Sequence, residues 1–347
     1  MSSEKDSEDP AETPGGAAWP EVPGLVARGL CMGSADVVPG VSGGTMALIL
    51  GIYVRLVAAI RTIDAAALRH VLRGRFAAAR DHVAWRFLGA VACGQALGIV
   101  TFTAVIPLPR LIQEHPELVY GLFFGLVLGT ILALGRDVIA GPPAGEAPPR
   151  GPNGGAACAV AGVLGVAFGL FIVTAVPVST PETPLFVFAC GAISICAMIL
   201  PGISGSFVLL LLRKYAFVLG ALGEVLRGDG PHGRIRPLVE VVVPFAFGCL
   251  LGLLAFSRFL HWLLRRAERA TLAFMTGLLI GSLYAIWPFA ERTYEVVRDK
   301  PRMIGWRPHL PALDGTAAAS LVLALAGFVG VVAMERLARR RPETAAA

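Results

Sequence analysis

The sequence predicts an all-α polytopic membrane protein made of two inverted repeats, each a re-entrant helical hairpin followed by three transmembrane helices. Three observations lead to this prediction: few charged residues, a series of long uncharged stretches, and an internal repeat. Of the 347 residues, 55% are hydrophobic and 16% are charged, whereas a soluble domain usually carries about 25% charged residues. The composition therefore excludes an ordinary soluble protein and indicates a lipid environment.

Long stretches without any charged residue follow one another along the chain. A bilayer core of about 30 Å takes roughly 20 helical residues, so most of these stretches predict one membrane crossing each. They cover residues 87–109, 118–135, 151–181, 183–212, 241–257, 270–290 and 315–334.

Residues 1–21 differ from the rest of the chain because they are polar and acidic, with proline and glycine interspersed. They have no apolar core like that of a signal peptide, so we expect a disordered tail. The net charge of +6 fits loops that face anionic headgroups, although ordinary loop composition would give the same value.

The six cysteines all lie in apolar stretches and form no Cys-x-x-Cys pair, and no histidine stands beside them at ligand spacing. We interpret them as small packing residues. The sequence therefore predicts no metal site and no cofactor.

The motif Pro-Gly-x-Ser-Gly occurs twice, at residues 39–43 and 201–205, an offset of 162 residues. Duplicated units of this kind are the sequence signature of a repeat architecture. Further matches at the same offset are Ala27 with Ala189, Gly29 with Gly191, Ala35 with Ala197, and Tyr53 with Tyr215. We therefore expect one unit over residues 22–180 and a second over residues 181–340.

Each unit begins with a segment that is too long for one ordinary span, at about 24–60 and 183–222. Pro-Gly interrupts each segment in the middle, where it removes a backbone donor and loosens the chain. A helical hairpin that enters the membrane and returns explains both features. The expected crossings are about 86–107, 117–138 and 156–178 in the first unit and 240–262, 270–290 and 315–336 in the second.

Three crossings per unit would invert the second unit relative to the first, a recurrent plan among transporters. The positive-inside rule does not decide this, because the lysines and arginines fit either returning hairpins or complete crossings. The inverted arrangement therefore rests on the segment length and on the helix break.

The hairpin tips, residues 39–45 and 201–207, are candidates for an anion site. Glycine-rich backbone at the start of a helix presents amides to a phosphate, and nearby hydroxyls add donors. A structural kink, or a cation held by carbonyl groups, are the alternatives. The candidate phosphate-binding residues are Gly40, Ser42, Gly43, Gly44 and Thr45 in the first tip, and Gly202, Ser204, Gly205 and Ser206 in the second.

Asp36 is the only acid inside either broken segment, and Met198 is its counterpart. An ionisable residue at that depth is costly, so a functional role is the default hypothesis. We predict ion coupling for Asp36, with helix capping or a pair with Arg28 as alternatives. A like charge disfavours a second one, so an ionised Asp36 would expel a phosphate and a protonated one would admit it.

Three cations, Arg28, Arg213 and Lys214, lie about 11 to 13 residues from the proline of their hairpins. On a helix this is roughly 16–20 Å, closer to the membrane surface than to the tip. We predict that they collect an anionic headgroup at the entrance. Interfacial snorkelling is the alternative.

At these residues the sequence resembles the DUF368 membrane proteins, also described as polyprenyl-phosphate transporters. The signatures are Ala-Asp-Val-Val-Pro-Gly-Val-Ser-Gly-Gly-Thr at 35–45 and Ala-Met-Ile-Leu-Pro-Gly-Ile-Ser-Gly-Ser-Phe at 197–207, within a similarity that extends over about 22–340. Two departures are Val54, where the family has an acid, and Arg213, where it has glycine.

The resemblance implies a flippase for undecaprenyl phosphate in the cytoplasmic (inner) membrane of a bacterium, which recycles the lipid carrier of cell-wall synthesis. Its partners would be this lipid and the membrane, with no nucleic acid. The sequence leaves the coupling ion, the direction of transport and a homodimer open.

Two other functions remain as alternatives. One is an enzyme similar to undecaprenyl pyrophosphate phosphatases, in which an arginine follows the Pro-Gly-x-Ser motif. Here Gly43 or Gly205 follows the serine and neither tip holds a histidine, so no nucleophile and base pair is evident. We therefore predict that the protein is not an enzyme. The other alternative is a carrier of small anions or ions.

Overall fold

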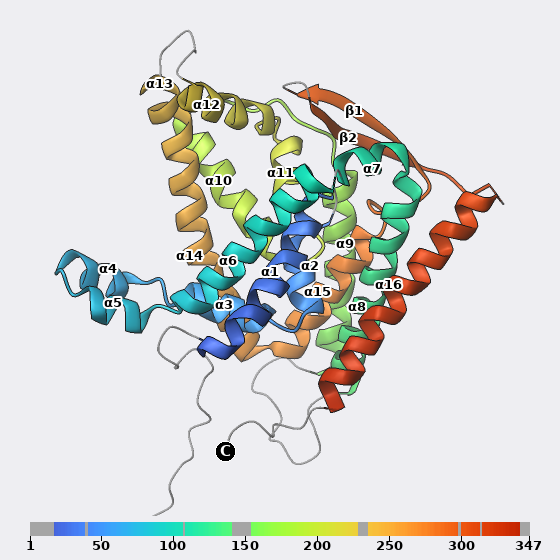
Figure 1. Ribbon diagram of the computed structural model, residues 1–347, viewed down its shortest axis with the longest axis horizontal. Coiled ribbons are helices and arrows are strands. Elements are labelled where there is room, and N and C mark those ends of the chain that lie inside the picture. Colours follow the sequence, from blue (N-terminus) through green and yellow to red (C-terminus); the bar gives the residue numbers. More distant parts are fainter. Residues whose placement is uncertain are drawn as a thin grey trace, which may run out of the picture.

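Helices make up most of the chain in a computed structural model, which describes residues 17–38, 41–106, 108–140, 154–227, 235–297, 300–312 and 314–340 (Figure 1). Most of the predicted N-terminal tail lies outside these ranges. In the first unit the helices are α1 (Val22–Asp36), α2 (Gly43–Ile49), α3 (Tyr53–Arg61), α4 (Ala65–Leu72), α5 (Phe76–His82), α6 (Trp85–Val100), α7 (Leu108–Glu114), α8 (Pro116–Ala140) and α9 (Gly155–Thr174). In the second they are α10 (Pro184–Ile199), α11 (Gly205–Leu211), α12 (Tyr215–Arg227), α13 (Ile235–Pro237), α14 (Val243–Arg266), α15 (Glu268–Ser282) and α16 (Gly315–Arg340).

Within the described residues, five helices are long and apolar enough to cross a membrane, and two bent helix pairs raise the number to as many as seven. The five are Trp85–Val105, Pro116–Ala140, Gly155–Thr174, Ile235–Arg266 and Gly315–Arg336. Two of them contain a π-helical segment, Thr101–Val105 and Leu238–Val242. The prediction of a helical polytopic membrane protein is confirmed.

Each broken segment contains a sharp bend between two short helices. The axes of α2 and α3 differ in direction by 118°, and those of α11 and α12 by 105°. A second break precedes each pair, between α1 and α2 and between α10 and α11. Each segment is therefore three helices long, with the Pro-Gly of the motif at the first break.

The first helix of each unit packs closely against the first long span, and the contact repeats between the units. A methyl group at Gly94 of α6 would collide with the carbonyl of Val26 on α1. In the second unit, a methyl group at Gly248 of α14 would collide with the carbonyl of Phe188 on α10. Val26 and Phe188 are 162 residues apart, the offset of the sequence repeat, whereas Gly94 and Gly248 are 154 residues apart. The packing therefore repeats, with a shorter connection between the two helices in the second unit.

The last helices pack across the two units. Helix α8 lies along α16, and α9 lies along α15 (Figure 1). In the first pair Gly125 approaches the carbonyl of Ala324, and in the second Gly277 approaches the carbonyl of Gly162. Because glycine allows this close approach of backbones, a substitution here would push two units apart rather than two helices of one unit.

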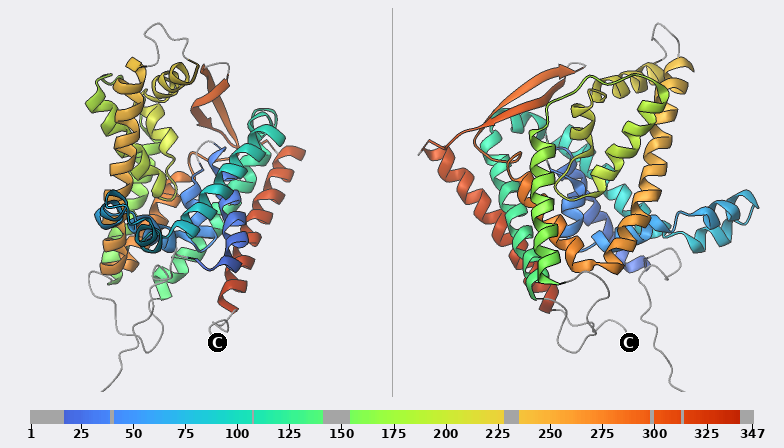
Figure 2. Two further views of the ribbon diagram at one scale, coloured as in Figure 1. Left: turned by 60° about the vertical axis from the view of Figure 1, so that its left-hand side comes forward. Right: turned by 180° about the vertical axis from the view of Figure 1, so that it is seen from behind.

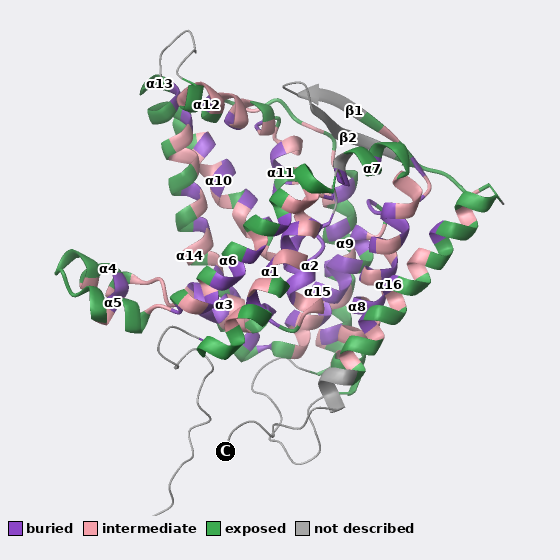
Figure 3. Cartoon of the chain, in the orientation of Figure 1, coloured by how far each residue is buried: buried purple, intermediate pink, exposed green. Residues whose placement is uncertain are grey.

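Buried residues gather in the middle of the bundle, around α1, α2, α8 and α15, whereas α14 and α16 expose much of their outer surface (Figure 3). The exposed side chains of α9 and α16 include large apolar ones such as Phe171 and Leu321, which are 66% and 61% exposed. Apolar surface of this extent on long helices fits contact with lipid.

A β-hairpin that the sequence did not predict follows α15. Helix α15 ends at Ser282, although a crossing was expected over 270–290. The chain continues through buried Ala285 and Ile286 into β1 (Ala290–Val297), which pairs antiparallel with β2 (Lys300–Pro308) near α7 (Figure 1). Residues 293–297 read Thr-Tyr-Glu-Val-Val, and β-branched and aromatic residues of this kind favour strands.

Candidate functional site

The two broken segments meet inside the bundle through hydroxyl groups of the first unit. The backbone amide of Gly202 donates a hydrogen bond to Thr45 Oγ1 at 2.9 Å. Ser42 Oγ donates to the carbonyl of Met198 at 3.3 Å, and the Tyr53 hydroxyl donates to the carbonyl of Ile199 at 3.0 Å. All three hydroxyl-bearing residues are at most 2% exposed.

These contacts follow from the helix break in the second unit. Helix α10 ends at Ile199, and Pro201 has no amide hydrogen with which to continue it. The last carbonyls of a helix lack partners within that helix, and a buried polar group without a partner is costly. Ser42 and Tyr53 supply donors to two of these carbonyls, so the first unit stabilises the broken end of the second.

Ser42 also begins the next helix of its own unit. Its Oγ accepts a hydrogen bond from the Gly44 amide at 3.1 Å as the N-cap of α2. Gly44 leaves no room for a side chain, because a Cβ there would lie 2.9 Å from the carbonyl oxygen of Ile199. The close approach of α10 therefore requires glycine at position 44, directly after the motif.

Asp36 ends α1, and both of its carboxylate oxygens accept hydrogen bonds. The Gly43 amide donates to Oδ1 at 2.7 Å, and Gln95 Nε2 on α6 donates to Oδ2 at 2.6 Å. Arg28 lies eight residues earlier on the same helix, roughly 12 Å away along the axis, and it is exposed. The carboxylate therefore caps α2 and does not form the alternative pair with Arg28.

Gln95 was missed by sequence reasoning. It is an amide side chain in the middle of an otherwise apolar span, and polar side chains in such spans usually bond to a neighbouring helix. That signal alone would have marked Gln95 as a candidate.

The second tip differs from the first. Ser204 precedes α11 but its side chain makes no cap bond, and its Oγ pairs instead with Ser206 Oγ at 2.8 Å. Ser206 is exposed. Ser194 of α10, also missed from the sequence, donates from Oγ to the carbonyl of Gly205 at 2.9 Å. Gly202 has a φ of +84°, which the left-handed turn requires of glycine.

The family model described as VCA0040-like, undecaprenyl phosphate translocase-like, matches residues 32–303 and includes both tips. The chain belongs to this family. It is 38% identical over 264 residues to a polyprenyl-phosphate transporter of Vibrio cholerae, covering 76% of this chain and 77% of that protein. It is 32% identical over 101 residues to a polyprenyl-phosphate transporter of Staphylococcus aureus, covering 29% and 34%. No solved structure matches the chain.

In this family member the predicted entrance cations have different surroundings. Arg28 and Arg213 are exposed. Lys214 is 2% exposed, and its Nζ donates to the carbonyl of Thr180 at 2.8 Å and lies 3.9 Å from a carboxylate oxygen of Glu182. Lys214 therefore stabilises the loop before α10 in this structure, and its predicted role at the entrance stays a prediction.

Of the predicted phosphate-binding residues, Gly40 lies outside the described part of the chain. In the first tip, the amides of Gly43 and Gly44 already have acceptors, as given above. The Thr45 amide donates to the carbonyl of Ser42 at 3.0 Å. The hydroxyls of Ser204 and Ser206 pair with each other. The described residues contain no group of three or more His, Cys, Asp or Glu that could hold a metal ion.

Proposed function

We propose that this protein is a flippase that carries undecaprenyl phosphate across the cytoplasmic membrane of a bacterium and so recycles the lipid carrier of cell-wall synthesis. Membership of the undecaprenyl phosphate translocase-like family supports this function. The name of the Vibrio cholerae relative, which aligns over most of both chains, supports a polyprenyl phosphate as substrate.

The observation that carries the proposal is the contact between the two tips, where the Gly202 amide bonds to Thr45 Oγ1 in a buried position. An unsolvated charge in hydrocarbon costs on the order of tens of kcal/mol in the idealised limit. A lipid phosphate needs polar groups at that depth, whereas its tail stays in lipid. Broken backbone with hydroxyl groups, surrounded by apolar helices, offers such a polar passage.

The proposal includes the inverted arrangement of two units with re-entrant hairpins. The bends of 118° and 105° support hairpins that return to the side from which they enter. The matched packing of α1 on α6 and of α10 on α14 supports two equivalent units. In alternating access, one unit would then move against the other around the tips.

We assign the first phosphate contacts to Ser204 and Ser206, with the backbone of Gly202 and Gly205 beside them. Their hydroxyls bond to each other, so a phosphate oxygen can replace that bond without exposing a buried group. This is the more open of the two tips, because Ser206 is exposed and Ser42 and Thr45 are buried.

The first tip would bind phosphate only after rearrangement, through Gly40, Ser42, Gly43, Gly44 and Thr45. In this structure the Asp36 carboxylate holds the Gly43 amide. Protonation of Asp36 would weaken that bond, because a neutral carboxyl accepts less strongly than a charged one. Asp36 would thereby couple proton uptake to phosphate binding.

An enzyme is the less favoured candidate. Both relatives are named transporters. Glycine follows each motif serine, so the arginine clamp expected of the pyrophosphatase is absent from both motifs. The hydrogen bonds given for Ser42 Oγ join it to two backbone groups, the Met198 carbonyl and the Gly44 amide, and not to a side-chain base.

The test is movement of undecaprenyl phosphate between the leaflets of liposomes that hold the purified protein, against empty vesicles and a Ser204→Ala/Ser206→Ala variant. Ser257→Ala is a matched control, because Ser257 is buried on α14 and bonds within its own helix. We expect fast movement that the double variant loses and the control keeps, with no phosphate released from the pyrophosphate form. Movement no faster than in empty vesicles, across several pH values and with a sodium gradient, would contradict the function.

A further inference from the structure

An arm formed by α4 and α5, residues 65–82, projects from the bundle between α3 and α6 (Figures 1 and 2). The second unit has no counterpart in its described part, because α12 ends at Arg227 and the chain reaches the next span at Ile235. Transport by two equivalent hairpins does not require such an arm, so it calls for a separate explanation.

One face of the arm is apolar and has no partner within the described chain. Leu68, Val71 and Leu72 lie three and four residues apart on α4, so they share one side of the helix. They are 58%, 45% and 76% exposed, and Phe76 at the start of α5 is 68% exposed. Large apolar side chains exposed together on one side of a helix mark an interaction site.

The remainder of the arm and its two connections are strongly basic. Residues 61–86 contain six arginines and two aspartates, with no lysine or glutamate. Both aspartates are paired, Asp64 with His82 and Asp81 with Arg80. The arginines are Arg61, Arg69, Arg73, Arg75, Arg80 and Arg86. A basic helix with one apolar face is typical of a segment that lies in a membrane interface.

The arm joins the bundle where a membrane span begins. Trp85 lies three residues after the end of the arm and starts the Trp85–Val105 span. Its ring contacts that of Trp19 edge-to-face with centroids 6.1 Å apart, and the Arg86 guanidinium lies over both rings. Tryptophan and arginine at the end of a span mark the headgroup level of a bilayer, so the arm leaves the bundle at that level.

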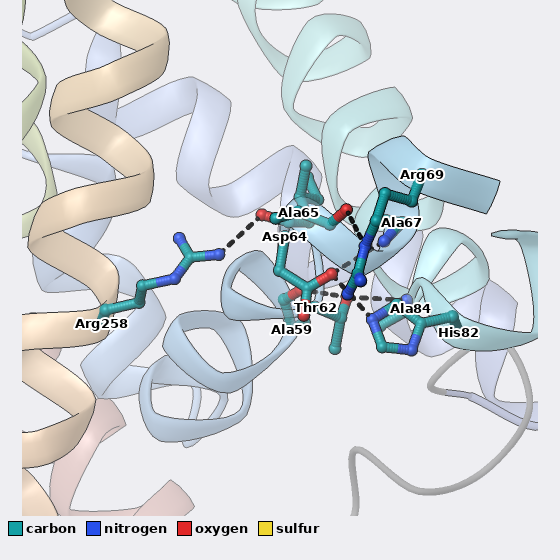
Figure 4. A network of polar contacts seen from close by, with 10 residues as sticks. Ala59, Thr62, Asp64, Ala65, Ala67, Arg69, His82, Ala84 and Arg258 are labelled. Carbon is teal, nitrogen blue, oxygen red and sulfur yellow. Dashed lines mark hydrogen bonds and ion pairs between the residues drawn. The ribbon is translucent and has the colours of Figure 1, made fainter. Parts of the chain in front are cut away.

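Polar contacts hold the base of the arm in place (Figure 4). Asp64 caps α4 by accepting from the Ala67 amide at 2.8 Å, and its carboxylate also bonds to His82 Nε2 at 3.0 Å. Arg258 of α14 donates to the carbonyl of Ile63 at 3.1 Å. The arm is therefore fixed to both units at one end, and its apolar face keeps a defined direction.

We propose that the α4–α5 arm lies in the headgroup layer of the membrane, with Leu68, Leu72 and Phe76 among the acyl chains and its arginines on anionic phospholipid headgroups. Arginines near an anionic surface are attracted to it, and burial of the apolar side chains adds to this attraction. The arm thereby fixes the depth of the first unit in the membrane.

The experiment places an environment-sensitive fluorophore at Leu72→Cys in a full-length variant whose six cysteines are replaced, in nanodiscs of phosphatidylcholine with or without phosphatidylglycerol. Asp81→Cys is the control position, since Asp81 is exposed on the polar side of the arm. We expect the label at 72, and not at 81, to show an apolar environment and quenching by nitroxide-bearing lipids. Phosphatidylglycerol should strengthen both signals of the label at 72. The triple variant Arg69→Gln/Arg73→Gln/Arg75→Gln should remove this effect of phosphatidylglycerol.

Hydrogen exchange of residues 65–82 in the unlabelled native protein gives an independent reading. Slower exchange in nanodiscs with phosphatidylglycerol than without it supports the proposal. A water-exposed label at 72 in both membranes, or exchange that does not depend on phosphatidylglycerol, overturns it. A third outcome is that exchange becomes faster when lipid is removed but is the same with and without phosphatidylglycerol. This outcome would also overturn the assignment to anionic headgroups.

Discussion

Thr45 of the first unit accepts a hydrogen bond from the backbone amide of Gly202, 157 residues later in the chain. Thr45 is 1% exposed, so no water can replace this acceptor in the present conformation. Motion of one unit against the other would break this bond together with those of Ser42 and Tyr53. The contact is therefore both a stabilising element and a barrier to rearrangement.

Thr45→Val should destabilise the protein by about 1–3 kcal/mol, because it leaves the buried Gly202 amide without an acceptor. Valine has nearly the same shape, so packing changes little. Thr130→Val is the matched control, since Thr130 is equally buried and bonds to the carbonyl of Leu126 in its own helix. Thermal unfolding in nanodiscs measures the stability of both variants. Equal losses of stability would mean that the bond between the units contributes no more than a bond within one helix.

Asp36→Asn should fold and remain capped, because an asparagine oxygen can accept from the Gly43 amide. It should lose the dependence of transport on pH, since its charge no longer changes. Asp36→Ala should also lose stability, because it leaves the Gly43 amide and the Gln95 side chain without their acceptor. The measurement is the initial rate of lipid movement in liposomes from acid to neutral pH. An Asp36→Asn profile that follows that of the native protein would remove Asp36 from the coupling mechanism.

Gly125→Ala should cost about 1–3 kcal/mol through overpacking, because the added methyl group would collide with the backbone of Ala324 across the α8–α16 contact. Gly135→Ala on the same helix meets nothing within 4 Å and should be neutral or stabilising. A comparison of thermal stability in nanodiscs separates the two. Equal stability of both variants would mean that α8 and α16 are not in contact in the membrane.

Much of the architecture could be predicted because the duplication is visible in the residues that packing requires. Close helix approach requires glycine at 94 and at 248, and each helix break requires Pro-Gly. Because both units need these residues, they stand at corresponding positions in the two units. A helix contact in one unit therefore predicts the corresponding helix contact in the other unit. The sequence also marked both tips as candidates for an anion site, and the Thr45–Gly202 bond joins these two tips.

Other features depend on register and on side-chain reach, which the sequence does not display. Gln95 meets Asp36 only because the glycines of α1 and α6 set the alignment of these helices. Lys214 was predicted from the sequence as an entrance cation, and the sequence did not show that its side chain bonds to the carbonyl of Thr180. The end of α15 at Ser282 was hidden because the following residues are as apolar as a helical span.

Acid should loosen the base of the arm through Asp64. Burial raises the pKa of Asp64, but hydrogen bonds from Ala67 and His82 lower it by more, so its pKa lies below the ordinary value. A lowered pKa means that the ionised carboxylate stabilises the fold at neutral pH, and that this contribution is lost as the pH falls through the lowered pKa. His70, whose ring centroid lies 6.2 Å from that of His82, is a further titratable group beside the pair.

Asp64→Asn keeps a capping oxygen but has no charge to lose. We expect thermal stability in nanodiscs to fall on acidification less in this variant than in the native protein, by a small amount because Asp64 is partly exposed. A parallel loss of stability in the two proteins would assign the acid response to other groups.

Arg213→Gly should stabilise the protein. Arg213 has a φ of +52°, and it is the non-glycine residue with positive φ in the described chain. Its counterpart at the repeat offset is Gly51, with a φ of +69° and no atom within 4 Å of the point where a Cβ would lie. A left-handed conformation costs a residue with a side chain roughly 1–2 kcal/mol relative to the right-handed one, and part of that cost returns because glycine is freer in the unfolded chain. A rise in thermal stability of the order of 1 kcal/mol for Arg213→Gly, with a loss for Gly51→Ala, is the expected pair of results. A loss in both variants would show that the exposed guanidinium of Arg213 makes a contact with lipid that outweighs the backbone strain.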